Sequence, residues 1–293
     1  MGDNSELQTH ESHPSTASYA VSEDGVVDYD GFAGAFLNAE VVLGGVDSAF
    51  GLSLSNLGAK KSWEALVAKA PVLDLSQYQM ESSSERLTGC DWKIFMEIYF
   101  DDYHVEPFHS GLSSWADCGK LTWLFEPCAQ VQLVGESALS GGKSQAYEKL
   151  ASLARQLGAP ASGFAAAWAA VYPGTMVEWL AGGLAISSVS PMGPGQSINR
   201  VVFAYPKEWV EKCPEFVKAH QQAYWETAKE DDEIAQRMQA GKNALAARGC
   251  DERGPAHPHL EAGIVEFHNW LAKNPWDRQA SASMAAYRKP LKT

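Results

Sequence analysis

The segment from Cys90 to His109 places acidic and imidazole side chains at spacings that constrain the fold more than any other part of the chain. Glu97, Asp101 and His104 follow one another at i, i+4 and i+7, which predicts that they stack on one side of a helix. Pro107 is expected to end that helix, because its ring removes an amide donor and clashes with the preceding turn. His109 would then turn back toward His104. Two imidazoles near carboxylates are typical of a two-histidine, one-carboxylate iron site.

The two histidines alone are weak support for a metal, since most histidines beside apolar helix residues are packing or surface residues. Their surroundings strengthen the interpretation. Trp92-Lys93 followed by Glu97-x3-Asp101-x2-His104-x4-His109 resembles the mononuclear-iron motif of the α-subunits of Rieske-type oxygenases. The resemblance implies Fe(II) bound by His104 and His109, with O2 as cosubstrate. It also implies a catalytic supporting role for Asp101, which would hydrogen-bond an iron-ligating histidine, and Glu97 is expected to support the same network.

The third iron ligand is expected in the acidic run at residues 230–233. Such a run usually indicates a solvated helix face. Asp231, however, shares a largely apolar helical stripe with Thr227, and a buried carboxylate needs a partner charge. The family's closing pattern, Glu-Asp followed by a helix ending in Gln-x-Gly, matches the start of this run and Gln239-Ala240-Gly241. The resemblance therefore implies Asp231 as the third ligand, with Asp232 as the alternative.

Length and charge narrow the classes of partner. The 293 residues can bury a full core, and 45% hydrophobic with 20% charged residues is ordinary for a globular protein. A formal net charge of −13 argues against nucleic acid or an anionic membrane surface as a partner. The polar N-terminus lacks the pattern of a signal peptide, and no apolar run has the roughly 20 residues of a membrane span. A cytoplasmic location is expected.

Residues 13–27 resemble the second half of a Rieske domain, but a Rieske cluster needs two cysteines and two histidines. Cys90 is the first of the five cysteines, and His10 and His13 are the only histidines before it. We therefore expect a vestigial Rieske-like β segment over residues 1–55 and a mononuclear-iron catalytic domain over residues 56–293. We expect no [2Fe–2S] cluster in this chain, so that NAD(P)H acts only through a reductase partner.

Strand-like and helical segments alternate along the second part of the chain in a pattern typical of an α+β fold. The strand-like segments are 121–125, 130–134, 176–179, 184–189 and 199–205, and the helical ones are 62–70, 144–157 and 209–248. The resemblance implies a helix-grip domain, in which a curved antiparallel sheet surrounds a long C-terminal helix. Pocket-lining candidates, each more often a core residue, are Trp179, Met176, Leu184, Phe203 and Phe100.

The resemblance predicts an oxygenase component that hydroxylates a small aromatic or heteroaromatic substrate with electrons from a partner's Rieske cluster. The family's oxygenase component that removes the 7-methyl group from methylxanthines lacks a Rieske domain, and this sequence resembles it in architecture. The resemblance suggests conversion of 7-methylxanthine to xanthine and formaldehyde. The donor would be a Rieske-bearing reductase or a complete α-subunit, in a trimer-based assembly. Two alternatives stay open: an inactive structural subunit paired with a complete α-subunit, and a ligand-binding helix-grip protein without redox chemistry.

Overall fold

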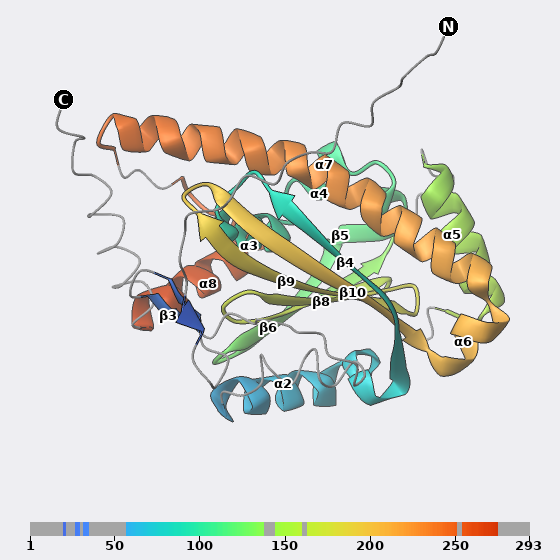
Figure 1. The fold of residues 1–293 in the computed structure, drawn as a ribbon. Helices are drawn as coiled ribbons and strands as arrows, with labels where there is room; N and C mark the ends of the chain where they lie inside the picture. The colour runs from blue at the N-terminus through green and yellow to red at the C-terminus, as the bar shows by residue number, and fades with distance from the viewer. Residues whose placement is uncertain are drawn as a thin grey trace, which may run out of the picture.

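A seven-stranded antiparallel sheet in the order β4-β10-β9-β8-β7-β6-β5 forms the centre of the molecule (Figure 1). The computed structural model describes residues 57–137, 144–159, 163–250 and 254–274, and the backbone of three short strands before them. The sheet strands are β4 (Tyr78–Thr88), β5 (Ala116–Glu126), β6 (Ala129–Glu136), β7 (Ala166–Val171), β8 (Thr175–Leu180), β9 (Gly183–Gly193) and β10 (Gln196–Pro206). The predicted α+β class is confirmed.

Little of the expected Rieske-like segment over residues 1–55 falls within the described part of the chain. Its backbone forms a small antiparallel sheet, β1-β2-β3. The strands are β1 (Ala20–Val21), β2 (Val27–Tyr29) and β3 (Phe32–Gly34). His10 and His13 lie outside the described residues, and the proposed domain boundary remains a prediction.

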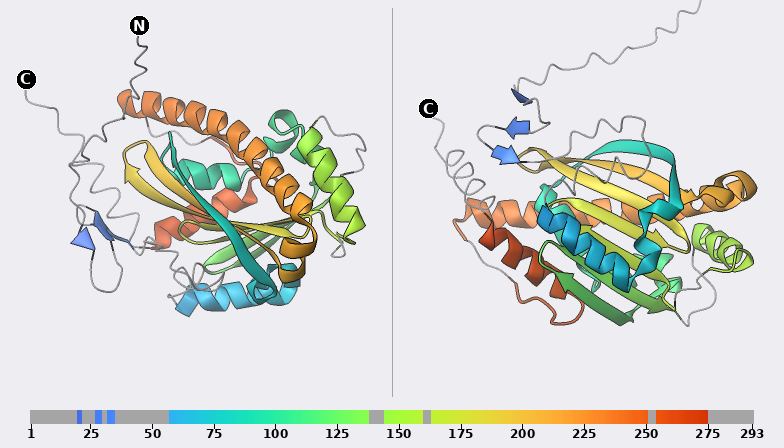
Figure 2. Two further views of the ribbon diagram at one scale, coloured as in Figure 1. Left: turned by 45° about the vertical axis from the view of Figure 1, so that its right-hand side comes forward. Right: turned by 90° about the horizontal axis from the view of Figure 1, so that it is seen from below.

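Both faces of the large sheet are covered by helices, which explains why its central strands are almost continuously apolar. One face packs on α2 (Leu57–Lys69) and the short helices η2 (Pro71–Leu73) and η3 (Leu75–Gln77). This helix begins before the expected start at Ser62, whose hydroxyl instead accepts a hydrogen bond from the Cys128 amide. Figure 2 shows α2 in front of the sheet when the molecule is seen from below.

The opposite face carries most of the other helices. They are α3 (Trp92–Tyr99), α4 (Val105–Phe108), η4 (Leu112–Ser114), α5 (Gln145–Gln156), α6 (Lys207–Lys212), α7 (Pro214–Ala247) and α8 (Ala262–Lys273). The long helix α7 crosses the sheet on the side away from α2 (Figure 1). Side chains of α5 and α7 form one apolar core with this face of the sheet. Among the described helices, none combines the length and apolarity needed to cross a bilayer.

The motif segment is not one helix, which corrects the stacking expected for Glu97, Asp101 and His104. Helix α3 ends at Tyr99, and the Asp101 carboxylate accepts a hydrogen bond from the Tyr103 amide at 2.7 Å. Such a local bond competes with helical hydrogen bonding and favours a turn. A new helix, α4, then follows His104, and Pro107 lies in its first turn, where a missing amide donor is tolerated.

Candidate functional site

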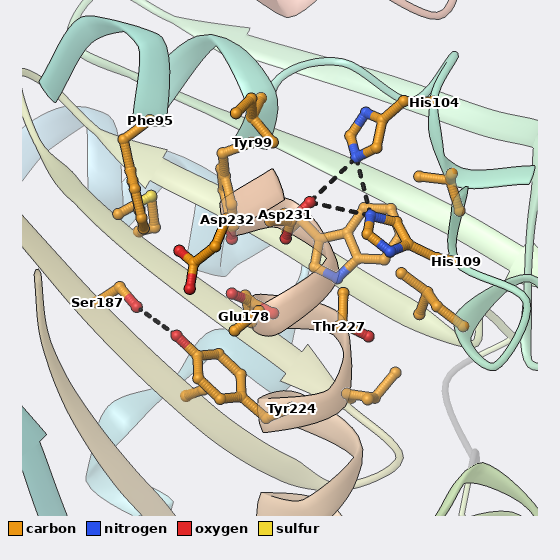
Figure 3. A pocket seen from close by; sticks show the side chains of 18 of the residues that line it. Phe95, Tyr99, His104, His109, Glu178, Ser187, Tyr224, Thr227, Asp231 and Asp232 are labelled. Carbon is orange, nitrogen blue, oxygen red and sulfur yellow. Dashed lines mark hydrogen bonds and ion pairs between the residues drawn. The ribbon is translucent and has the colours of Figure 1, made fainter. Parts of the chain in front are cut away.

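A pocket of about 100 Å³ lies between the helix-covered face of the sheet and the helices α3, α4 and α7 (Figure 3). Its walls combine apolar side chains with several titratable ones. The members that matter for the argument are His104, His109, Trp168, Glu178, Tyr224 and Asp231. Convergent polar groups in an otherwise apolar pocket mark the default candidate for an active site.

Helix α7 supplies one wall of this pocket through residues three and four positions apart. Tyr224, Thr227, Asp231 and Ala235 all line it. Because a helix turns once every 3.6 residues, these positions share one face. The structure thereby brings the carboxylate of Asp231 to the pocket.

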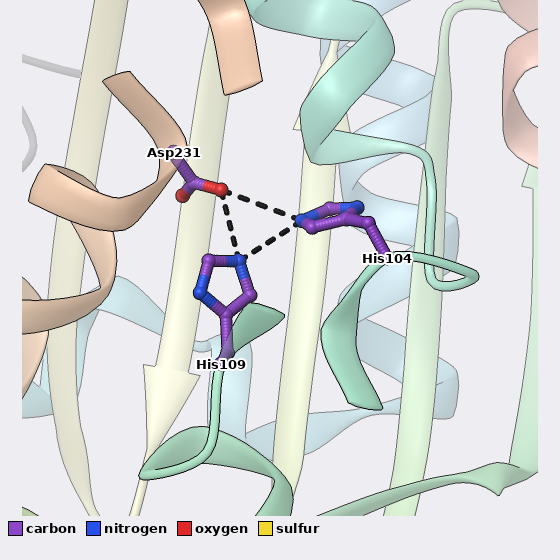
Figure 4. Close-up of side chains that lie close together, drawn as sticks. All are labelled: His104, His109 and Asp231. Carbon is purple, nitrogen blue, oxygen red and sulfur yellow. Dashed lines mark hydrogen bonds and ion pairs between the residues drawn. The ribbon is translucent and has the colours of Figure 1, made fainter. Parts of the chain in front are cut away.

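His104, His109 and Asp231 converge on one point from α7 and from both ends of α4 (Figure 4). The two Nε2 atoms are 3.0 Å apart. The Oδ1 atom of Asp231 lies 3.4 Å from Nε2 of His104 and 3.0 Å from Nε2 of His109. That oxygen is buried and accepts no hydrogen bond of regular geometry within the described part of the chain. Three converging donor atoms of this kind fit a facial triad for a divalent metal.

Two further carboxylates orient the imidazoles. The Nδ1 atom of His109 donates a 2.7 Å hydrogen bond to Oε2 of Glu230. The Nδ1 atom of His104 faces Oδ2 of Asp101 at 3.3 Å. A proton held on each Nδ1 leaves the lone pair of each Nε2 directed at the common point.

The electrostatics of the cluster also suit a cation. Burial lowers the pKa of His104, but hydrogen bonds and charges from Asp101 and Asp231 outweigh it and raise that pKa to about 9. Burial raises the pKa of Asp231, but its two histidine partners outweigh this and lower that pKa to about 2. Positive charge is therefore favoured beside an ionised carboxylate, and a metal ion could take the place of the protons.

The neighbouring acids of the motif regions have different surroundings. Asp232 forms an ion pair with Arg86, so it is Asp231 that the structure brings to the imidazoles. Glu97 is not brought to the site, which corrects its predicted place in the network. Its carboxylate contacts Lys242 at 2.6 Å and His268 at 3.0 Å, and it does not line the pocket.

Of the five pocket candidates proposed from the sequence, Met176 alone lines the pocket. Trp179 and Leu184 belong to the core between the sheet and α2. Phe203 and Phe100 are buried in the cores on the other face. The alternation of side chains along a strand separates Met176 from Trp179, since odd steps point to opposite faces.

Sequence reasoning missed Glu178, which lies between Met176 and Leu180 on the pocket-facing side of β8. Figure 3 shows its carboxylate in the pocket near Asp231 and Tyr224. Burial, and secondarily the negative charge of Asp231, raise the pKa of Glu178 to about 8. A glutamate in the middle of an apolar strand was the available signal, because an acid is rarely placed in a core without a partner.

A family comparison matches residues 67–274, more than half of the chain, to the catalytic domain of ring-hydroxylating alpha subunits. The chain is 42% identical over 203 residues to a putrescine 2-hydroxylase of Ralstonia nicotianae, which covers 69% of this chain and 56% of that protein. It is 39% identical over 205 residues to a putrescine 2-hydroxylase of Bordetella bronchiseptica, covering 69% of this chain and 48% of the relative. The chain thus spans about half the length of these curated relatives.

Solved structures share the fold at low sequence identity. A quaternary ammonium Rieske monooxygenase superposes with a TM-score of 0.54 at 16% identity, covering 72% of this chain and 52% of that one. Dicamba monooxygenase bound to dicamba superposes with a TM-score of 0.50 at 10% identity, covering 90% and 70% of the two chains. At these identities the likeness concerns the fold alone.

Proposed function

The chain belongs to the family of ring-hydroxylating oxygenase alpha subunits, and from that premise we propose that it hydroxylates a small aliphatic amine at an iron site. The observation that carries the proposal is the convergence of His104, His109 and Asp231 inside the pocket. The family assignment confirms the predicted resemblance to Rieske-type oxygenases and the prediction of an oxygenase enzyme.

His104, His109 and Asp231 would hold Fe(II), and Asp101 and Glu230 would keep the imidazoles in the tautomer that presents Nε2. Bound iron of this type, with open coordination positions, activates O2 when electrons are supplied. The apolar pocket wall limits the access of water, and the paired acids orient the ligands before substrate enters. Retention of the whole ligand set favours a catalytic protein over an inactive structural subunit or a ligand-binding protein without redox chemistry.

The substrate class is proposed from the relatives. Both are putrescine 2-hydroxylases, and putrescine is an aliphatic diamine. Hydroxylation would replace a carbon-bound hydrogen with a hydroxyl group. One atom of O2 would enter the product and the other would leave as water, with two electrons from a donor and two protons from solvent. The prediction of an aromatic substrate, and of methylxanthine demethylation in particular, finds no support in these relatives.

Electrons must come from a centre outside these 293 residues. None of the five cysteines is followed by a histidine two or three positions later, so these residues lack the Cys-x-His and Cys-x2-His pairs that hold a Rieske cluster. We propose that a Rieske-bearing polypeptide docks on this domain, in an oligomer or through a reductase.

An isotope experiment tests the function. The Fe(II)-loaded chain is supplied with putrescine, labelled O2, NADH and a Rieske-type reductase, and the product is analysed by mass spectrometry. We expect a hydroxylated diamine carrying one labelled oxygen, and no product with His104→Ala. Label found in a product of 7-methylxanthine, with putrescine unchanged in the same assay, would contradict the proposed substrate class.

A further inference from the structure

Glu178 occupies the centre of the sheet face that forms the floor of the pocket. In the register of the sheet it lies directly opposite Trp168 on β7 and Ala185 on β9. All three line the pocket. Directly opposed residues on one face of an antiparallel pair have Cβ atoms about 5 Å apart, so the indole and the carboxylate are neighbours.

The Glu178 carboxylate differs from the other pocket acids in having no partner. Within the described residues no side chain donates a hydrogen bond to it or forms an ion pair with it, whereas Asp101, Asp231 and Asp232 each face a basic group. Asp102 is the nearest comparison, but it is only 3% exposed and receives a long contact from the Cys118 thiol at 3.6 Å. Glu178 is the less enclosed of the two, and its carboxylate faces the pocket (Figure 3).

From this arrangement we propose that Glu178 is the specificity-determining residue that binds an ammonium group of the substrate, with the indole of Trp168 against the same cation. The inference deepens the proposed function, on which it rests for the oxidation step; binding of the cation is a separate claim. An unpartnered carboxylate in a low-dielectric pocket is costly, and a bound ammonium would supply the missing charge and hydrogen bonds. An aromatic face beside the carboxylate adds a cation–π contact.

The neighbouring groups are consistent with this role. The pKa of Glu178 is raised, as expected for a buried acid without a positive neighbour. The hydroxyls of Ser187 and Tyr224 hydrogen-bond to one another at 3.1 Å on the same wall. Arg86 is the one arginine or lysine among the pocket-lining residues, and the carboxylate of Asp232 pairs with it. The pocket therefore has no unpaired arginine or lysine among its described lining residues to oppose the binding of a cation.

Calorimetric titration of the Fe(II)-loaded full chain tests the proposal, with putrescine, butylamine and the neutral 1,4-butanediol as probes. We expect the wild type to bind both amines more tightly than the diol. Glu178→Gln, of nearly equal size, should weaken amine binding roughly 10- to 100-fold, the effect of losing a charge-assisted hydrogen bond, with little change for the diol. Glu178→Asp should retain the preference for amines. Glu85→Gln, which alters an exposed glutamate paired with Arg200, is the matched control.

The same proteins show whether Glu178 is a binding residue for the ammonium group, here called the anchor, or only a structural residue. Because its pKa of about 8 keeps Glu178 mostly protonated at neutral pH in the ligand-free protein, Glu178→Gln replaces one neutral side chain with another of similar size. The iron content should therefore be unchanged, and the melting temperature of the ligand-free protein should not fall. Unchanged amine affinity in Glu178→Gln, or equal affinity of the wild type for putrescine and the diol, would overturn the inference. If amines bind in a Glu178-dependent way but no hydroxylated product forms, the proposed function fails and the anchor stands. If hydroxylation occurs with the same KM in Glu178→Gln, the anchor fails and the function stands.

Discussion

Asp231 and Asp232 are adjacent in the sequence, yet they face different partners. One contacts the imidazoles of His104 and His109, and the other forms an ion pair with Arg86. Successive helical residues point about 100° apart, so two neighbouring acids can belong to separate clusters. The sequence resemblance favoured Asp231 and left Asp232 as the alternative. The two acids are distinguished by Arg86 on β4, which is far from them in the sequence and pairs with Asp232 in the structure.

At the residue scale, iron affinity should depend on pH. In the metal-free protein the pKa of His104 is raised to about 9, so at neutral pH a proton must leave before the ring can bind a metal. The pKa of His109 is raised as well. We expect Fe(II) affinity to increase by about tenfold per pH unit for each displaced proton, from pH 6.5 up to about 9. Chelator competition at a series of pH values measures this, and a constant affinity across that range would be inconsistent with histidine ligation.

Asp101 and Glu230 should act on iron through the histidines that they contact. Asp101→Asn and Glu230→Gln keep the size of each side chain but remove the charge that favours the Nδ1 proton. Each is expected to weaken iron binding roughly 10- to 100-fold without abolishing it. Glu233→Gln, an exposed glutamate of the same helix paired with Arg237, is the control and should bind iron as the wild type does. Complete loss of iron in Asp101→Asn would instead make Asp101 a direct ligand.

At the scale of elements, the long helix α7 combines two tasks along one face. Its first half packs on the sheet through residues such as Phe216 and Ala223, and its middle carries Asp231. The sequence predicted a helix over residues 209–248, because helix-forming residues act locally. It could not predict that α3 ends at Tyr99, since the Asp101 turn competes with the helix through a single side-chain hydrogen bond.

His220 on α7 should lower the stability of the folded protein as the pH falls below about 6.5. It is 1% exposed, and burial lowers its pKa to about 3, while Tyr205 contacts its Nδ1 at 3.1 Å. Between pH 6.5 and about 3 the unfolded chain binds a proton at this position that the folded chain does not, so stability falls as pH falls. The contribution is up to about 1.4 kcal/mol per pH unit.

Glu178 and Asp102, whose pKa values are raised to about 8, have the opposite effect on stability. Below about pH 8 the folded chain holds their protons more tightly than the unfolded chain, so these two acids stabilise the fold as the pH falls. The difference between the wild type and His220→Gln isolates the histidine. When the pH of urea unfolding is lowered from 7 to 5, the change in the free energy of unfolding should be less unfavourable in the variant than in the wild type. An equal change in both proteins would mean that His220 is protonated in the folded state.

At the scale of the whole molecule, the sheet is the frame that brings distant segments together. Asp231 is more than a hundred positions from His104 and His109 in the sequence. The pocket floor comes from β7, β8 and β9, which lie between these two ligand segments. The resemblance supplied the ligand set because iron chemistry fixes residue types and short spacings. Glu178 and Trp168 could not be paired in advance, since their opposition depends on the register of β7 with β8.

The iron content of the purified protein, with Asp231→Ala and Asp232→Ala as a matched pair, tests whether His104, His109 and Asp231 bind iron. We expect about one iron per chain in the wild type, without the visible spectrum of a [2Fe–2S] cluster. We expect similar iron content in Asp232→Ala, and little or none in a folded Asp231→Ala. Full iron content in Asp231→Ala, or loss of iron only in Asp232→Ala, would contradict the assignment of Asp231 as the third ligand.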